Sequence, residues 1–157
     1  MIQDISYYVH NKNIIPLNID RHIIKVHELT LLFSGKMTYF VNDEEYSMTS
    51  GDIIYVPAGS MRQRKTGNVE NNYISINFHS SEKIDFEPLI KNCINEELKI
   101  LLDYLDTVYA HPFNTNPKKI ALVLEAIILQ IYDNIAVSST SQLATKIIDY
   151  ISTNFRE

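Results

Sequence analysis

Gly51-Asp52-Ile53-Ile54-Tyr55-Val56-Pro57-Ala58-Gly59 is the stretch of this sequence that says most about the fold. Its four central residues are β-branched or aromatic and are bounded by turn residues, a pattern typical of a short buried strand. Gly51 lets the chain turn into the strand, while Pro57 and Gly59 fit a turn that ends it. We therefore expect a tightly turned strand at this place.

Similar runs precede and follow this stretch in the first half of the chain. Each is short, rich in β-branched or aromatic residues and bounded by turn residues; they cover residues 22–26, 28–33, 36–41 and 73–78. Strands at such regular short spacing predict an antiparallel sandwich or barrel.

The second half of the chain changes to helical patterns. A short helical stretch is expected at 86–90. Asn95, followed by two glutamates, has the character of a helix N-terminus, and Asn116-Pro117 offers an N-cap with a favoured first-turn proline. A third helix is expected over 141–155, after a small polar hinge at 137–141. Strands followed by helices predict an α+β fold, a β-barrel with a C-terminal bundle of two to three α-helices.

Length and charge limit the possible functions. The 157 residues are enough for about one domain with a real core. Lysine and arginine number 14 against 19 acidic residues, which gives a net charge of −5. Binding to nucleic acid usually needs a basic face, because neutralised phosphates supply most of the non-specific affinity. We therefore do not expect this chain to bind DNA by itself.

The single cysteine and the apolar runs bear on the compartment. Cys93 excludes an internal disulfide, suits a reducing compartment and is expected to be a buried, inert thiol. No apolar run approaches the roughly 18 residues of a membrane span. Residues 1–8 lack the order of a signal peptide. We expect a cytoplasmic protein without a membrane partner.

Two segments resemble the paired motifs of the cupin superfamily. His22, Ile24, Glu28 and Gly35 have the spacing of the first motif. The second motif is matched by Gly51, Pro57 and Gly59, with Arg62 where a metal-binding histidine would stand. The resemblance implies a cupin-like, jelly-roll β-barrel. If residues 22 to 28 formed one continuous strand, the side chains at positions 22, 24, 26 and 28 would all point to one face, which in a closed barrel is the interior.

The same positions argue against a metal enzyme. Such an enzyme needs three or four converging His and carboxylate ligands. Ile24 cannot bind a metal ion, and Arg62 would repel one. We expect no metal, no cofactor, no catalytic residue and hence no enzyme. A small metal-dependent cupin isomerase or dioxygenase is the alternative, and an interaction module with a filled barrel is a third possibility.

A more specific resemblance is to regulators of the AraC family. The tract 27–39 is similar to the sensor domain of that family, and 51–57 and 74–78 look like its barrel strands. Residues 144–155 resemble the helix that opens its DNA-binding domain; the matching residues are Ile147, Tyr150, Ile151, Asn154 and Phe155. A generic amphipathic helix is the plain alternative there.

The AraC resemblance implies three parts. Residues 1–80 would form an N-terminal arm and an effector-binding barrel, with the arm closing over the ligand. Residues 81–136 would supply helices for dimerisation. Residues 137–157 would be a linker and the first helix of a DNA-binding domain whose helix-turn-helix units lie beyond the chain given. The resemblance thus implies a sensor that controls DNA contact only through that further domain.

The effector is expected to be a small organic molecule inside the barrel, a sugar or an organic anion. Arg62 and Arg64 share a strand parity, and guanidinium groups offer forked donors for an anionic or hydroxyl-rich ligand. The alternative is that both arginines are solvated at the rim. Tyr73 could line the same space. The predicted ligand-binding residues are His22, Ile24, Glu28, Tyr39, Tyr55, Arg62 and Arg64.

The helix expected over 117–134 carries an apolar stripe wider than one core contact needs. We predict a homodimer interface on this stripe, formed by Ile120, Leu124, Ile127 and Ile131. Complete burial of the stripe against the barrel is the alternative.

Overall fold

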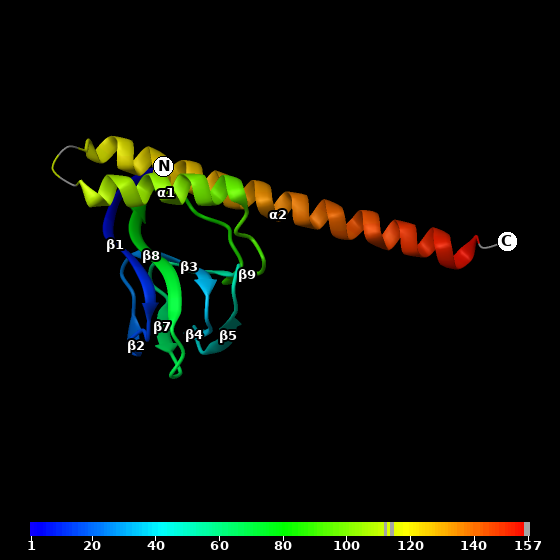
Figure 1. The fold of residues 1–157 in the computed structure, drawn as a ribbon, viewed down its shortest axis with the longest axis horizontal. Helices are drawn as coiled ribbons and strands as arrows, with labels where there is room; N and C mark the ends of the chain where they lie inside the picture. Colours follow the sequence, from blue (N-terminus) through cyan, green and yellow to red (C-terminus); the bar gives the residue numbers. More distant parts are fainter. Residues whose placement is uncertain (112, 114, 156–157) are drawn as a thin grey trace.

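The computed structural model describes all residues except 112, 114 and 156–157. Strands come first and helices after, which confirms the α+β order (Figure 1). The strands are β1 (Ile2–Ile14), β2 (Ile19–Ile23), β3 (His27–Ser34), β4 (Met37–Val41), β5 (Glu44–Met48), β6 (Ile53–Val56), β7 (Met61–Lys65), β8 (Asn71–Ser80) and β9 (Leu89–Ile90). The helices are α1 (Glu96–Ala110) and α2 (Pro117–Asn154).

The strands form two antiparallel sheets. One has the order β1-β8-β3-β6-β9 and the other β2-β7-β4-β5. Among the first eight strands, consecutive ones lie in different sheets except for the hairpin of β4 and β5, and this is the order of a double-sheet jelly roll, the architecture that cupins share with several other all-β domains. The predicted antiparallel jelly roll is confirmed.

Alternation along the strands creates two separate cores. On β3, Glu28, Thr30 and Leu32 face the opposite sheet, whereas Leu29 and Leu31 face the helices. The inner core lies between the sheets, and the outer core lies between the five-stranded sheet and the two helices. Successive side chains of a strand point to opposite faces, and both faces of the five-stranded sheet are covered, so each of its strands contributes to both cores.

The helix N-termini lie where the sequence predicts them. The Asn95 side chain accepts a hydrogen bond from the Leu98 amide at 3.0 Å, and the Asn116 side chain accepts one from Lys118 at 2.9 Å. The two helices run antiparallel across the outer face of the five-stranded sheet (Figure 1). Beyond Ile131 no described residue of α2 is buried, and the helix projects away from the barrel.

Two helical predictions were wrong. Residues 86–90 contain the short strand β9, which pairs with β6, instead of a helical turn. Residues 137–141, where a hinge was expected, belong to the continuous helix α2. The helix expected over 141–155 is therefore the end of α2 and not a separate third helix. This stretch contains neither glycine nor proline, and the Thr140 hydroxyl donates to the Ala136 carbonyl at 3.0 Å, so nothing in it interrupts the helix.

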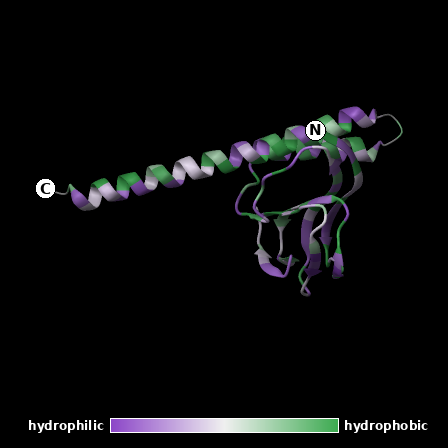
Figure 2. Ribbon diagram, turned by 180° about the vertical axis from the view of Figure 1, so that it is seen from behind, coloured by the Kyte–Doolittle hydropathy of each residue, from purple (hydrophilic) through white to green (hydrophobic). Residues whose placement is uncertain are grey.

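Helix α2 carries both hydrophobic and hydrophilic residues along its whole length (Figure 2). By length and composition alone α2 could cross a membrane, contrary to our prediction that no segment is long and apolar enough. The length and composition of α2 are weak evidence for a membrane span, because its first half supplies Leu124, Ile127 and Ile131 to the outer core.

Candidate functional site: a pocket in the barrel

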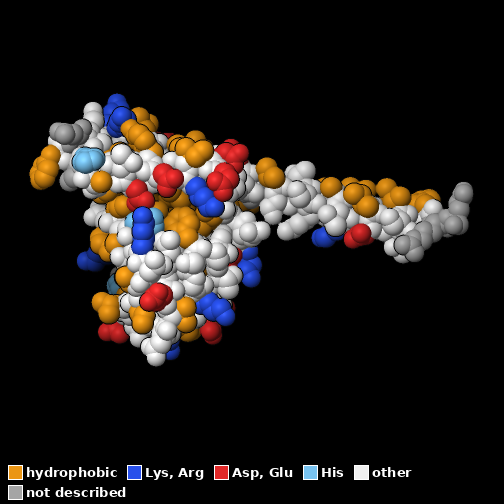
Figure 3. All heavy atoms as spheres, viewed as in Figure 1, with side chains coloured by type: hydrophobic (Ala, Val, Ile, Leu, Met, Phe, Trp, Pro, Cys, Tyr) orange, Lys and Arg blue, Asp and Glu red, His pale blue; other side chains and the backbone are white. Residues whose placement is uncertain are grey.

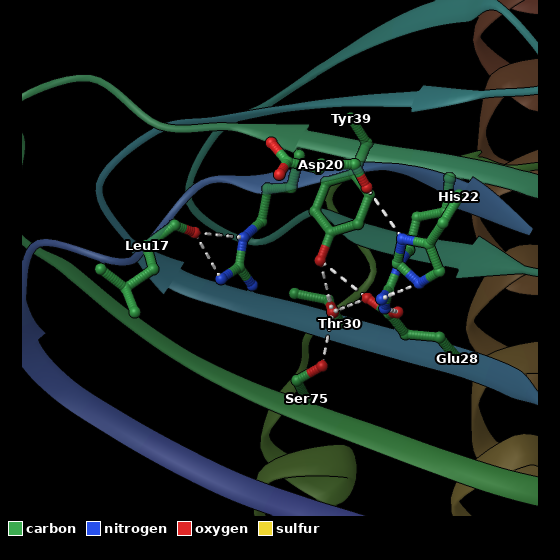
Figure 4. A network of polar contacts seen from close by, with 9 residues as sticks. Leu17, Asp20, His22, Glu28, Thr30, Tyr39 and Ser75 are labelled. Atoms are coloured by element: carbon green, nitrogen blue, oxygen red, sulfur yellow. Dashed lines mark hydrogen bonds and ion pairs between the residues drawn. The ribbon is translucent and has the colours of Figure 1, made fainter. Parts of the chain in front are cut away.

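A buried carboxylate organises the inner face of the barrel. Glu28 of β3 is 1% exposed. Its Oε1 accepts hydrogen bonds from the Tyr39 hydroxyl at 2.8 Å and from the Thr30 hydroxyl at 3.0 Å. Thr30 also lies 3.0 Å from the Ser75 hydroxyl, so β3, β4 and β8 meet in one polar network (Figure 4). Burial and the charge of Glu28 raise the pKa of Tyr39, so its phenol stays neutral and donates.

Arg62 of β7 balances the charge of Glu28. Its Nη1 donates to Glu28 Oε2, and its Nη2 donates to Nε2 of His22 at 3.0 Å. The His22 Nδ1 lies 2.8 Å from the carbonyl oxygen of Asp20. One ring nitrogen therefore accepts and the other donates, which is the pattern of a neutral imidazole. Pairing of β2 with β7 places His22 directly opposite Arg62.

Arg64, two residues further along β7, has no direct ion pair of this kind among the described residues. It is 7% exposed, and its Nε and Nη2 donate to the carbonyl oxygen of Leu17 at 3.3 and 2.8 Å. Its guanidinium lies 5.4 Å from the centre of the Tyr73 ring. Within the part of the chain that the structure describes, no carboxylate lies at ion-pair distance from it. A buried charge without an opposite charge is costly unless something else stabilises it.

A pocket of about 240 Å³ opens beside these arginines. Its walls come from β1, β2, β7 and β8: Tyr7, Val9, Ile19, Arg62, Arg64, Tyr73, Ser75 and Asn77. Two buried polar atoms of this wall, Arg62 Nε and Asn77 Oδ1, have no hydrogen-bond partner among the described residues. Buried polar atoms are normally paired, so one donor and one acceptor of the residues that line the pocket are left unsatisfied. The charged residues of this wall are Arg62, which pairs with Glu28, and Arg64.

Five predicted ligand-binding residues come together around this network, namely His22, Glu28, Tyr39, Arg62 and Arg64. Only the two arginines line the pocket directly. Ile24 is buried in the inner core and contributes packing instead of a pocket wall. It lies in the turn between β2 and β3, so the idea of one continuous strand from 22 to 28 was wrong.

The placement of Tyr55 inside the barrel was also wrong. Ile54 and Val56 on the same strand belong to the inner core, so Tyr55 faces the helices by alternation. Its hydroxyl lies 2.9 Å from His27 Nδ1, and its ring meets Phe86 edge-on at 5.5 Å. Burial raises the pKa of Tyr55 to about 12.

Sequence reasoning missed several pocket residues. Ser75 and Asn77 alternate with the buried Ile74 and Ile76 on β8, and this break in an apolar strand was a usable signal. The N-terminal segment expected to be an arm is the edge strand β1, which pairs with β8 over most of its length. It supplies Tyr7 and Val9 to the pocket as a strand of the sheet instead of as an arm that closes over the ligand.

The predicted dimer residues are used differently. Leu124, Ile127 and Ile131 are fully buried in the outer core, and Ile120 packs against it. Their stripe is covered by the sheet and by α1 of the same chain. The assignment of Leu124, Ile127 and Ile131 to a homodimer interface was therefore wrong, whereas the partly buried Ile120 stays a prediction.

Two further observations bear on the choice of site. Among the described residues, no three His, Cys, Asp or Glu side chains could together hold a metal ion. The carboxylate of Glu28 already forms an ion pair with Arg62, and the positive charge of Arg62 would repel a metal ion. The residues at the cupin ligand positions therefore do not fit a cation. A larger pocket, about 320 Å³, lies between residues 85–93 and α2, but none of the buried atoms without a partner lies in it.

Comparisons with known proteins give limited similarity. No protein-family model and no curated protein matches the sequence. Among solved structures, a conserved protein of unknown function from Streptococcus pyogenes, SPY1581, is 18% identical with a TM-score of 0.41, over 52% of this chain and 70% of that one. The EutQ protein of Clostridium difficile is 17% identical with a TM-score of 0.35, over 42% of this chain and 51% of that one, about half its length. An RmlC-like cupin from Shewanella frigidimarina is 14% identical with a TM-score of 0.38, over 48% and 65%. The jelly-roll assignment rests on the strand order described above.

Proposed function

We propose that the barrel pocket binds a small organic anion and that the chain acts as a sensing module. The observation that carries this proposal is Arg64, a buried guanidinium that contacts the carbonyl oxygen of Leu17 and the face of Tyr73 and has no carboxylate at ion-pair distance among the described residues. An anion beside Arg64 would supply the missing opposite charge. Charge-assisted hydrogen bonds in such a site are roughly twice as strong as neutral ones.

The pocket favours a particular kind of anion. Its acidic group would accept from Arg64 and from Nε of Arg62, and a hydroxyl or amino group would donate to Asn77 Oδ1. Val9 and Ile19 offer an apolar wall for a short carbon skeleton. At about 240 Å³ the pocket is smaller than the roughly 300 Å³ typical of drug-sized ligands. A small hydroxy or amino carboxylic acid fits these features better than a neutral sugar.

Strand β1 offers a route from the pocket to the helices. Tyr7 and Val9 line the pocket, while Tyr8 and His10, on the other face of the strand, contact Asp106 of α1. A ligand that shifts β1 would therefore act on α1 directly. Such a signal requires the ligand to favour one arrangement of strand and helix over another.

The output of the sensor is proposed from sequence resemblance. Residues 144–155 are similar to the helix that opens the AraC-type DNA-binding domain. On this basis we propose a cytoplasmic transcription regulator whose DNA contact is made by a helix-turn-helix domain, and not an enzyme. No observation favours the metal-dependent enzyme, since Ile24 and Arg62 stand at two of its ligand positions.

Isothermal titration calorimetry tests the proposal. The panel would contain small hydroxy acids, amino acids, dicarboxylic acids and aromatic acids, with neutral sugars as the uncharged comparison. We expect at least one acid to bind and Arg64→Gln to weaken that binding by about 10-fold or more, since hydrogen bonds to charged groups contribute roughly 1.5–3 kcal/mol.

Arg21→Gln is the matched control, because Arg21 forms an exposed pair with Asp43 outside the pocket. It should bind the same acid as the unmodified protein does. Binding that Arg64→Gln leaves unchanged, or a panel in which only sugars bind, would contradict the anion assignment.

A further inference from the structure

The hydroxyl groups beside the barrel pocket have no proton to spare. Thr30, Tyr39 and Ser75 each carry one hydroxyl proton. Their oxygens and Glu28 Oε1 form four contacts of 2.8–3.0 Å. Two oxygens at this distance with no proton between them repel each other, so all three protons are needed inside the network, where one of them is shared between two contacts.

Ser75 therefore presents only lone pairs to the pocket. Its contact in the network is with Thr30, which lies opposite it in the pairing of β3 with β8. Thr30 and Tyr39 donate to Glu28, so the proton between Ser75 and Thr30 is that of Ser75. The Ser75 side chain points from β8 toward Thr30 (Figure 4). Since Ser75 also lines the pocket, its oxygen can only accept there.

Asn77 supplies a second acceptor to the same side of the pocket. It follows Ser75 by two residues on β8, so both side chains project from one face of the strand. Asn77 Oδ1 is buried and has no hydrogen-bond partner among the described residues. In the register of β3 with β8, Asn77 lies opposite Glu28 as Ser75 lies opposite Thr30. Both acceptors thus come from the strand beside the buried carboxylate.

The pocket therefore has two poles of opposite character. Arg64 and the unsatisfied Nε of Arg62 are charged donors at one pole. At the other pole, Ser75 and Asn77 offer oxygen lone pairs, and the hydroxyl protons behind Ser75 point away from the pocket toward Glu28. Hydrogen bonds in a chain polarise one another, so the carboxylate at its end makes the Ser75 oxygen a stronger acceptor. One pole fits a carboxylate, and the other fits a group with several protons.

We propose that the ligand of this pocket is an α-amino acid in its zwitterionic form. The inference rests on the proposed function, because it keeps a carboxylate at Arg64 and adds an ammonium group at Ser75 and Asn77. An ammonium has three protons and can donate to both oxygens, whereas the one hydroxyl of a hydroxy acid can donate to only one of them. A second carboxylate would place lone pairs against lone pairs. Val9 and Ile19 offer an apolar wall to the amino acid side chain.

The charge of the whole molecule agrees with a zwitterion. The chain carries a net charge of −5, and acidic and basic side chains are interspersed over the face of the barrel seen in Figure 3. An excess of negative charge on a protein repels a ligand with a net negative charge, whereas a zwitterion has no net charge. Recognition then depends on the two poles inside the pocket and not on attraction from a distance.

Calorimetry with matched ligands tests the proposal. Each set contains an amino acid, the hydroxy acid and the unsubstituted acid of the same carbon skeleton. The three sets are alanine, lactate and propionate; valine, α-hydroxyisovalerate and isovalerate; and phenylalanine, phenyllactate and hydrocinnamate. We expect an amino acid to bind about 10-fold or more tightly than the other two members of its set, because hydrogen bonds from a charged donor are the stronger ones.

Ser75→Ala assigns the contact to one of the two acceptors. It should weaken binding of the amino acid by about 10-fold and binding of the unsubstituted acid by less than about threefold. Comparing two ligands within one variant separates the lost acceptor from any general loosening of the barrel, since loosening affects both ligands alike. Ser47→Ala, at an exposed position of β5 outside the pocket, is the matched control and should change neither affinity.

The possible results distinguish the ammonium site from the proposed function. If a hydroxy acid or an unsubstituted acid binds as tightly as its amino counterpart, the ammonium site is overturned while the anion site at Arg64 stands. The same holds if Ser75→Ala weakens all members of a set equally. If no acid binds at all, the proposed function itself fails, and the ammonium site fails with it.

Discussion

Glu28, Arg62 and Arg64 project into the barrel, Glu28 and Arg64 buried and Arg62 partly exposed, and the three are not equivalent. Glu28 and Arg62 form an ion pair with further hydrogen bonds to Tyr39, Thr30 and His22. Arg64 is held by the carbonyl oxygen of Leu17 and the face of Tyr73. The first two stabilise the fold only as a pair, whereas the third has no carboxylate at ion-pair distance among the described residues.

Glu28→Gln tests the importance of the buried pair. The amide keeps the shape and the acceptor oxygen but leaves the charge of Arg62 without a partner. We expect a loss of about 3–5 kcal/mol in the free energy of unfolding, measured by urea denaturation at pH 7. Asp43→Asn removes the exposed partner of Arg21 and should cost less than about 1 kcal/mol. Equal losses in the two variants would mean that the barrel pair is not effectively buried.

Tyr55 makes stability depend on alkaline pH. Burial raises its pKa to about 12 in the folded chain, above the ordinary value of 10.0. The folded state holds this proton more tightly, so the contribution is complete below pH 10 and is lost as the pH rises from 10 to 12. The loss amounts to about 2–3 kcal/mol.

Denaturation at pH 8, 10 and 11 should therefore show a smaller decline for Tyr55→Phe than for the unmodified protein. Tyr104→Phe, at an exposed position on α1, controls for the removal of one phenol. A decline that is the same with and without the Tyr55 hydroxyl would refute the assignment.

Among the elements, β1 has the most varied role. One face of this strand lines the pocket through Tyr7 and Val9. From its other face, His10 Nδ1 lies 2.6 Å from Asp106 of α1, His10 Nε2 lies 2.9 Å from Asn72 Oδ1, and the Tyr8 hydroxyl donates to Asp106. Burial and the contact with Asp106 raise the pKa of Tyr8, which keeps its phenol a donor. The strand is thus attached both to the pocket and to the helix layer.

Asp106→Ala should loosen β1 from α1. It removes the acceptor for two partly buried groups, so we expect a loss of about 2 kcal/mol in stability and faster amide exchange along β1. Asp103→Ala, one turn earlier on the exposed side of the same helix, should change stability by less than about 0.5 kcal/mol. Hydrogen exchange read by mass spectrometry distinguishes the two, and unchanged exchange of β1 in Asp106→Ala would contradict the attachment.

The whole molecule consists of a compact body and the projecting second half of α2, and the two parts differ in their contribution to stability. The body contains both cores and the pocket. Every described residue from 136 to 155 is exposed, so that part of α2 adds nothing to either core. Its apolar side therefore lies outside both cores of this chain.

A chain ending at Ala136 should therefore keep the stability of the body. At a dilution where only monomer is present, we expect its free energy of unfolding to agree with that of the full chain within about 1 kcal/mol. Its far-ultraviolet circular dichroism should lose the helical signal of the removed segment. A marked fall in the denaturation midpoint would show that the projecting half supports the body after all.

The sequence by itself determined the local structure of this protein. Alternation of apolar and polar residues specified most strands, the Gly51 and Pro57 turns bounded β6, and Asn95 and Asn116 marked the helix starts. These signals are local, since backbone conformation and capping depend on residues a few positions apart. The grouping of His22, Glu28 and Arg62 was also recognisable from the sequence, because a buried carboxylate such as Glu28 needs a positively charged partner.

Only the tertiary structure decided which side of each element is covered, and by what. Periodicity predicted the apolar stripe of α2 but could not tell that the sheet of the same chain covers Leu124 and Ile131 while Leu122 and Leu129 stay exposed. The sequence suggested Tyr55 as a residue of the barrel interior, yet its neighbours Ile54 and Val56 belong to the inner core, so Tyr55 faces the helices. Burial depends on the packing of distant segments, and one strand or helix carries no record of its neighbours.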